Sequence, residues 1–132
     1  MKLGLDILAN VLLVAIGGAI GASTRYLLGG WIQSQAGSPF PWGTFIINIS
    51  GSLLIGIVFG FAERGFLSAN ARLLLATGIL GGYTTFSTFS FETMSLLISG
   101  GKGMALLNTV GQTVVGLLAV YTGFFLIRLI MV

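Results

Sequence analysis

The segment Gly81-Gly82-Tyr83-Thr84-Thr85-Phe86-Ser87-Thr88-Phe89-Ser90, followed by Glu92, decides how this chain folds. It lies inside a long apolar run, yet two adjacent glycines come directly before a series of hydroxyl residues. Glycine loosens a helix because it lacks a Cβ atom, and hydroxyl side chains bond to backbone groups that a helix leaves free. The pattern predicts a break at residues 81–85 of a membrane-spanning helix. The alternative is an unbroken helix whose small residues pack closely on a neighbour.

The composition indicates a membrane protein. Of the 132 residues, 55% are hydrophobic and 7% are charged, and the mean hydropathy is +1.05, whereas soluble domains carry about 25% charged residues. The chain has no cysteine and no histidine, which excludes disulfides, the commonest general base and the usual zinc ligands. Its cations are spread singly, so we expect no nucleic-acid partner. With no histidine beside its serines and no carboxylate pair, the chain is not expected to be an enzyme.

Hydropathy predicts a single domain, residues 1–132, with four membrane-spanning segments. These segments cover residues 8–28, 44–62, 72–98 and 104–131. Each is long enough for a hydrocarbon core of about 30 Å, and the third is longer than one straight crossing needs, which favours two half-helices joined at the break. A polar, glycine-rich loop is expected at residues 29–43. Asp6, and an apolar run that continues to Leu28, favour a retained first span over a cleaved signal.

The cations near the span ends differ little between the two sides of the membrane. On the side of the termini lie Lys2, Arg64, Arg72 and Arg128, and on the other side lie Arg25 and Lys102. So small a bias permits insertion in both orientations, although it is also compatible with one. Four helices of this size cannot both pack and enclose a polar path, so the polar residues inside the spans need a partner surface. A homodimer is the simplest arrangement that provides one.

Neutral polar side chains inside the spans are the candidate functional groups. They are amides and hydroxyls, among them Thr44, Asn48, Ser87, Thr88, Asn108 and Gln112. Amide N–H and hydroxyl groups can donate to an anion that has lost its water. Thr44 and Asn48 are four residues apart, as are Asn108 and Gln112, so each pair is expected to share a helix face. The amides either line an ion path or only hold helices together.

Three further side-chain types stand out in this region. Phe86 and Phe89 share a helix face, where their electropositive ring edges either attract an anion or pack as ordinary aromatic residues. Glu92 is the one acid expected deep in the membrane, where it either couples protons or binds polar groups near the break. Arg25, near the end of the first span, is expected to reach the membrane interface.

These motifs resemble the small fluoride channels, the Fluc family. Residues 81–92 are similar to the signature of that family's third helix, and Trp42-Gly43-Thr44 followed by Asn48 is similar to its second-helix motif. A third similarity, to the family's first helix, lies at Gly17, Gly18, Gly21 and Arg25. Two departures are visible. Tyr83 stands where the family pattern has leucine, and the fourth-helix positions that vary in the family hold Asn108, Gln112 and Gly116.

The resemblance implies an all-α membrane protein with its third helix broken in mid-membrane. It further implies an antiparallel, dual-topology homodimer in the bacterial inner membrane, surrounded by lipid, that exports fluoride through two pores. The implied fluoride pathway contains Asn48, Phe86, Phe89, Ser87 and Thr88, to which we add Thr44 and Gln112. A structural sodium ion is implied at the dimer centre, bound by the backbone carbonyls of Gly81 and Thr84 from each subunit. Arg25 and Glu92 match family positions without an assigned role.

Two other functions stay open at this point. A proton-coupled small multidrug transporter would use Glu92 as its membrane carboxylate. A non-transporting assembly subunit would use the asparagine and glutamine side chains only to hold helices together.

Overall fold

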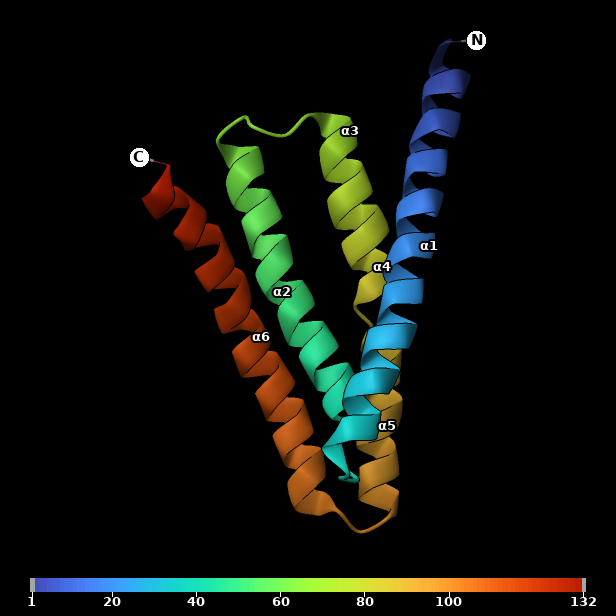
Figure 1. The fold of residues 1–132 in the computed structure, drawn as a ribbon, viewed down its shortest axis with the longest axis vertical. Helices are drawn as coiled ribbons and strands as arrows, with labels where there is room; N and C mark the ends of the chain where they lie inside the picture. Colours follow the sequence, from blue (N-terminus) through green and yellow to red (C-terminus); the bar gives the residue numbers. More distant parts are fainter. Residues whose placement is uncertain (1, 132) are drawn as a thin grey trace.

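The structure is a computed structural model that describes residues 2–131, and every regular element in that range is a helix. The elements in chain order are α1 (Lys2–Ala36), α2 (Trp42–Glu63), α3 (Ala69–Arg72), the π-helix η1 (Leu73–Leu80), α4 (Gly81–Tyr83), α5 (Phe86–Ile98) and α6 (Lys102–Ile130). Figure 1 shows both ends of the chain at the same end of the molecule, with α2 beside α6 and α1 along α4. The expectation of an all-helical fold is confirmed.

Three of these helices are long and apolar enough to cross a membrane, namely Gly4–Ala36, Trp42–Glu63 and Lys102–Ile130. This confirms the expectation of an integral, multi-pass membrane protein. The third predicted span, residues 72–98, is divided among shorter helices: α3, η1 and α4 follow one another directly, and the extended backbone of Thr84 and Thr85 separates them from α5. That the chain crosses the membrane four times stays a prediction.

The first helix is longer than predicted, and the loop after it is shorter. Residues 29–36, expected in the loop, continue α1 as far as Ala36. The helix ends where Gly37 adopts a φ of +54°, a left-handed conformation that favours glycine. The amide of Gln33 then fixes the short connection, since its Nε2 donates to the carbonyls of Ser38 and Phe40 at 3.1 Å each. Gly29 and Gly30, predicted to follow the end of the first span, lie inside the helix.

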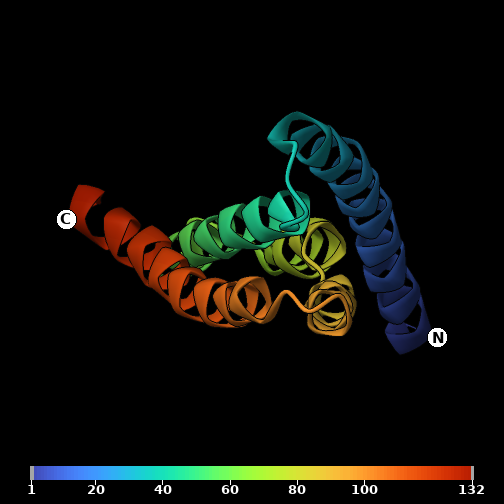
Figure 2. The ribbon, with the colours of Figure 1, turned by 90° about the horizontal axis from the view of Figure 1, so that it is seen from below.

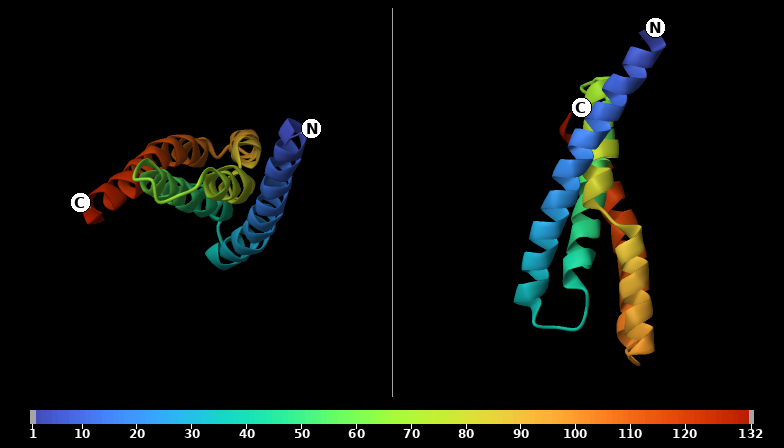
Figure 3. Two further views of the ribbon diagram at one scale, coloured as in Figure 1. Left: turned by 90° about the horizontal axis from the view of Figure 1, so that it is seen from above. Right: turned by 90° about the vertical axis from the view of Figure 1, so that its right-hand side faces the viewer.

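The break in the third span is narrower and later than predicted. Gly81–Tyr83 is helical, so the predicted range 81–85 is wrong at its start. Extended backbone is confined to Thr84 (φ −84°, ψ 157°) and Thr85 (φ −149°, ψ 117°), after which α5 begins at Phe86. Figure 3 shows this extended link between α4 and α5 in its right-hand view. The glycine pair does not break the helix: Gly82 packs closely on Gly18, whereas a Cβ atom at Gly81 would meet only the Ala76 carbonyl oxygen, at 3.7 Å.

The glycines on α1 bring its backbone against η1 and α4. A Cβ atom at Gly17 would lie 2.8 Å from the Leu74 carbonyl oxygen, and one at Gly82 would lie 2.5 Å from the Gly18 carbonyl oxygen. One at Gly21 would overlap the carbonyl oxygen of Ile79. The expectation that these small residues allow close helix contact is confirmed.

A second glycine contact joins α2 to α6. A Cβ atom at Gly56 would overlap the carbonyl oxygen of Val120, and one at Gly123 would overlap that of Leu53. Figure 2, seen from below, shows α2 and α6 running along each other, with α1 on the far side of the molecule. The two glycine contacts thus hold α1 and α6 on opposite sides of the central helices.

The close contact at Gly21 can be tested directly. We expect Gly21→Ala to destabilise the protein by about 1–3 kcal/mol, because the added methyl group has no space against the backbone of η1. Gly30→Ala is the matched control on the same helix, since a Cβ atom there would meet nothing within 4 Å. The measurement is the melting temperature of the purified protein in detergent. Equal melting temperatures for the two variants would show that α1 and η1 do not pack as described.

Candidate functional site

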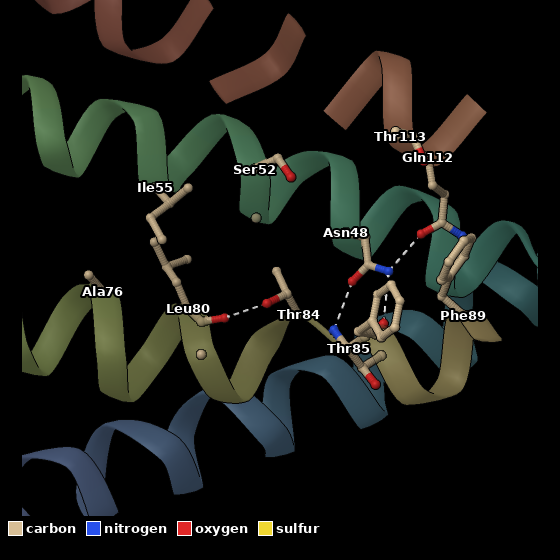
Figure 4. Close-up of a pocket in the computed structure, with 13 residues that line it drawn as sticks. Asn48, Ser52, Ile55, Ala76, Leu80, Thr84, Thr85, Phe89, Gln112 and Thr113 are labelled. Atoms are coloured by element: carbon tan, nitrogen blue, oxygen red, sulfur yellow. Dashed lines mark hydrogen bonds between the residues drawn. The ribbon is translucent and has the colours of Figure 1, made fainter. Parts of the chain in front are cut away.

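An open groove of about 350 Å³ lies beside the break and is bordered by α2, η1, α5 and α6. Polar and aromatic side chains meet in it, including Asn48, Thr84, Thr85, Phe86, Phe89 and Gln112. Figure 4 shows the side chains of Asn48, Phe89 and Gln112 converging from separate helices next to Thr84 and Thr85. We call this cavity the Asn48 groove. It brings together Asn48, Phe86, Phe89 and Gln112, which the sequence singled out separately.

Asn48 binds both the N–H and the carbonyl group of Thr85, whose backbone is extended. The Thr85 N–H donates to Asn48 Oδ1 at 2.8 Å, and Asn48 Nδ2 donates to the Thr85 carbonyl at 3.1 Å. These backbone groups have left the helix, so they need partners elsewhere. The carboxamide of Asn48 supplies both, as a neighbouring strand would. The conformation of the break therefore depends on one side chain of α2.

Thr85 also starts the next helix. Its Oγ1 accepts a hydrogen bond from the Thr88 N–H at 3.2 Å, the usual geometry of a helix N-cap. The same hydroxyl lies 3.0 Å from Thr88 Oγ1 and 3.3 Å from Ser87 Oγ. Ser87 and Thr88, expected on the ion path, thus belong to the capping network of α5. Their predicted contact with fluoride stays a prediction.

The break changes what the carbonyls of Gly81 and Thr84 can bond to. In a continuous helix they would accept from the N–H groups of Thr85 and Thr88. Those two donors go instead to Asn48 Oδ1 and Thr85 Oγ1. Gly81 and Thr84 are the residues at which the resemblance to the Fluc family implies a cation site. Among the described residues, no group of three or more histidine, cysteine or acidic side chains could hold a metal ion.

A chain of hydrogen-bonded amides runs from Asn48 across α6 to α5. Asn48 Nδ2 donates to Gln112 Oε1 at 2.7 Å, and Gln112 Nε2 donates to Asn108 Oδ1 at 2.8 Å. Asn108 Nδ2 then donates to Thr93 Oγ1 at 2.9 Å. Asn108 is fully buried. The prediction that Asn108 and Gln112 share a helix face is confirmed by their direct bond.

Phe86 and Phe89 line the Asn48 groove together. Their ring centroids are 5.5 Å apart and the ring planes are tilted by 46°. Phe86 is 79% exposed, so it is not packed as a core residue within a single chain. Phe86 therefore stands at the open side of the groove, and Phe89 and Gln112 line the same cavity.

Glu92, Arg25 and Thr44 occupy a different cavity, of about 290 Å³, which also has Thr85 and Thr88 on its wall. Thr44 Oγ1 donates to Glu92 Oε1 at 2.8 Å. The other carboxylate oxygen, Oε2, is buried and has no partner among the described residues. Arg25 Nε donates to the Gly82 carbonyl at 3.1 Å, and its place at the membrane interface stays a prediction. Thr85 is common to both cavities.

Three contacts at the site were missed from the sequence. Thr85 was assigned to the break but not recognised as an N-cap, although its position three residues before Thr88 fits that role. Thr93, the partner of Asn108, has no role predicted from the sequence. Tyr83 was noted as a departure from a family pattern, and its hydroxyl lies 2.9 Å from Ser50 Oγ on α2. That contact required knowledge of which faces of α2 and α4 meet.

Replacing Asn48 tests its hold on the break. In Asn48→Leu, both backbone groups of Thr85 lose their partner, at a cost of about 1–3 kcal/mol for each group left unpaired. We expect faster amide hydrogen exchange at Thr85 and in the first turn of α5. Ser52→Ala is the control, because Ser52 lines the same groove without bonding to the break. Unchanged exchange in Asn48→Leu would mean that the break is held by something else.

Comparison with known proteins gives a consistent result. The family model described as "CrcB-like protein, Camphor Resistance (CrcB)" matches residues 12–124. A Thermus thermophilus protein named "Fluoride-specific ion channel FluC" is 50% identical over 113 residues, or 86% of this chain and 89% of the relative. Proteins of the same name from Chloroflexus aurantiacus and Agrobacterium fabrum are 49% identical over 115 residues and 46% over 120. These matches cover 86% and 90% of this chain, and 91% and 96% of the two relatives.

Proposed function

This chain belongs to the CrcB-like family, and from that membership we propose that it is a fluoride-specific ion channel rather than an enzyme. The observation that carries the proposal is the identity of 46% to 50% with channels of that name over nearly their whole length. The chemistry of the Asn48 groove supports it, because neutral donors and aromatic rings meet there without a fixed positive charge.

The groove suits an anion that must shed its water. Fluoride is small and strongly hydrated, so a dry path has to replace its water with hydrogen-bond donors. In the Asn48 groove, amides and hydroxyls provide such donors without a cation that would trap the ion, and the edges of Phe86 and Phe89 add a weaker attraction. The second cavity holds the hydroxyls of Thr44 and Thr88 together with Arg25 and Glu92, and it shares Thr85 with the Asn48 groove. The proposed path passes both cavities.

We further propose an antiparallel homodimer with two such paths. The exposure of Phe86, 79% in one chain, supports a partner over the open side of the groove. Opposite insertion of the two copies fits the small bias of lysine and arginine between the two sides. Two copies related by a two-fold axis would contribute equally, which gives two equivalent pores.

A structural sodium ion between the two copies is part of the same proposal. The carbonyl oxygens of Gly81 and Thr84 fit such an ion, because they have lost their helical donors and hard cations prefer oxygen ligands. Bound there, the ion would supply positive charge that links the two broken helices. The break itself is held by Asn48, so the carbonyls are arranged by this chain's own contacts.

No observation favours the alternatives. A multidrug transporter would need Glu92 beside a substrate, but its Oε1 accepts from Thr44 inside a cavity of about 290 Å³. A non-transporting assembly subunit does not fit the names of the relatives, which are fluoride-specific ion channels. Neither alternative has support from the relatives.

Efflux from liposomes tests the function. We expect vesicles that contain the protein to release fluoride rapidly and chloride hardly at all. Phe89→Ile should lower fluoride efflux by about tenfold, because it removes the ring edge from the groove while keeping an apolar side chain. Phe91→Ile is the matched control on the same helix, since Phe91 is 72% exposed and lies outside the groove. Equal release of both anions would refute the proposed selectivity.

The sodium proposal has a separate test. Protein stripped of sodium and reconstituted with a bulky organic cation should lose most of its fluoride efflux and regain it when sodium is added. Thr84→Ser should behave as the wild type, because the proposed ligand is the main-chain carbonyl. An alanine at position 81 would have space for its methyl group, because the nearest atom to a Cβ there is the Ala76 carbonyl oxygen, at 3.7 Å. The proposal would be wrong if efflux were the same with and without sodium.

A further inference from the structure

The amide that faces the ion path can be identified by counting donors. An asparagine side chain has two N–H groups. In Asn48 one of them goes to the Thr85 carbonyl at 3.1 Å and the other to Gln112 Oε1 at 2.7 Å. Asn48 therefore has no N–H left for an anion unless a bond that holds the break is given up.

Gln112 differs in this respect. Its Oε1 accepts from Asn48, and one N–H of Nε2 goes to Asn108 Oδ1 at 2.8 Å. Its second N–H makes no further bond to the residues that the structure describes. Hydrogen bonds to Asn48 and Asn108 thus fix the Gln112 amide at both of its polar atoms. Gln112 lines the Asn48 groove near Phe89 (Figure 4), so its remaining N–H is available there.

The orientation of that amide follows from the two ends of the hydrogen-bond chain. The Thr85 N–H can only donate, so Asn48 turns its Oδ1 toward it and its Nδ2 toward Gln112. At the other end the Thr93 hydroxyl donates to the Phe89 carbonyl at 2.8 Å, so its oxygen accepts from Asn108. Both ends require Gln112 to point its oxygen at Asn48 and its nitrogen at Asn108.

We propose that Gln112 is the side-chain amide that donates to fluoride in this chain, and that buried Asn108 is a positioning residue that holds the Gln112 amide in its donating orientation. The inference rests on the proposed fluoride function and deepens it. Asn48 then has the separate task of holding the break. Asn108 acts through Gln112 and does not itself reach the groove, since it is fully buried.

Two substitutions of Gln112 test the donor in fluoride-loaded liposomes. Gln112→Met keeps the length of the side chain but has no N–H, so fluoride efflux should fall about tenfold and half-maximal efflux should need more fluoride. Gln112→Glu still accepts from Asn48 but turns an oxygen toward the groove, so efflux should fall further. Thr122→Val is the control, because the Thr122 hydroxyl bonds only within α6, to Leu118 O. Near-normal efflux in Gln112→Met would overturn the assignment.

A double-mutant cycle tests the positioning role. Asn108→Leu alone should lower fluoride efflux. In the Gln112→Met variant the same substitution should cause no further loss of efflux, because its effect passes through Gln112. Equal losses in both backgrounds would make Asn108 a general packing residue and overturn the proposal. If Asn108→Leu does not assemble, as judged by gel filtration, Thr93→Val takes its place, since it removes the partner that holds Asn108. If the wild-type protein itself shows no fluoride efflux, the proposed function is refuted. That result differs from a failure of the Gln112 proposal, in which the wild type conducts and Gln112→Met conducts equally well.

Discussion

The two hydrogen bonds between Asn48 and Thr85 are the constraint on which the rest of the site depends. They occupy the N–H and the C=O of a residue whose backbone has left the helix, and such groups are costly to leave unpaired away from water. With Thr85 held in this way, its hydroxyl is free to cap α5. The carbonyls of Gly81 and Thr84 lose their helical donors for the same reason. One side chain of α2 thus shapes the groove, the start of α5 and the proposed cation site.

Close glycine contacts provide the frame around this break. The backbone of α1 lies directly against η1 and α4 at Gly17 and Gly21, and that of α2 lies against α6 at Gly56. Because these helices touch through their backbones, side-chain amides can reach from α2 across α6 to α5. The chain of bonds that ends at Thr93 is short for this reason. A wider spacing between α2 and α6 would separate Asn48 from Gln112.

Much of this arrangement could be predicted from the sequence, and the limits have physical causes. The apolar runs indicated the long helices, and the run of glycine and hydroxyl residues indicated an irregular third span. Glycine has two uses in a helix, however, and the sequence does not say which one applies at Gly82. It packs on Gly18, while the break falls at the threonines. Spacing paired Asn108 with Gln112 correctly, but contacts between helices, such as Asn48 with Thr85, depend on packing that no local pattern encodes.

The most direct test of the central claim is the reversal potential of the purified protein in a planar bilayer, with fluoride on both sides but at a higher concentration on one, the fluoride side, and more chloride on the other. The account predicts a potential set by the fluoride gradient, because the groove offers neutral donors suited to the small, strongly hydrated ion. Addition of chloride to the fluoride side should leave that potential unchanged. A potential that moved with the chloride concentration, or an absence of current in fluoride, would contradict the account.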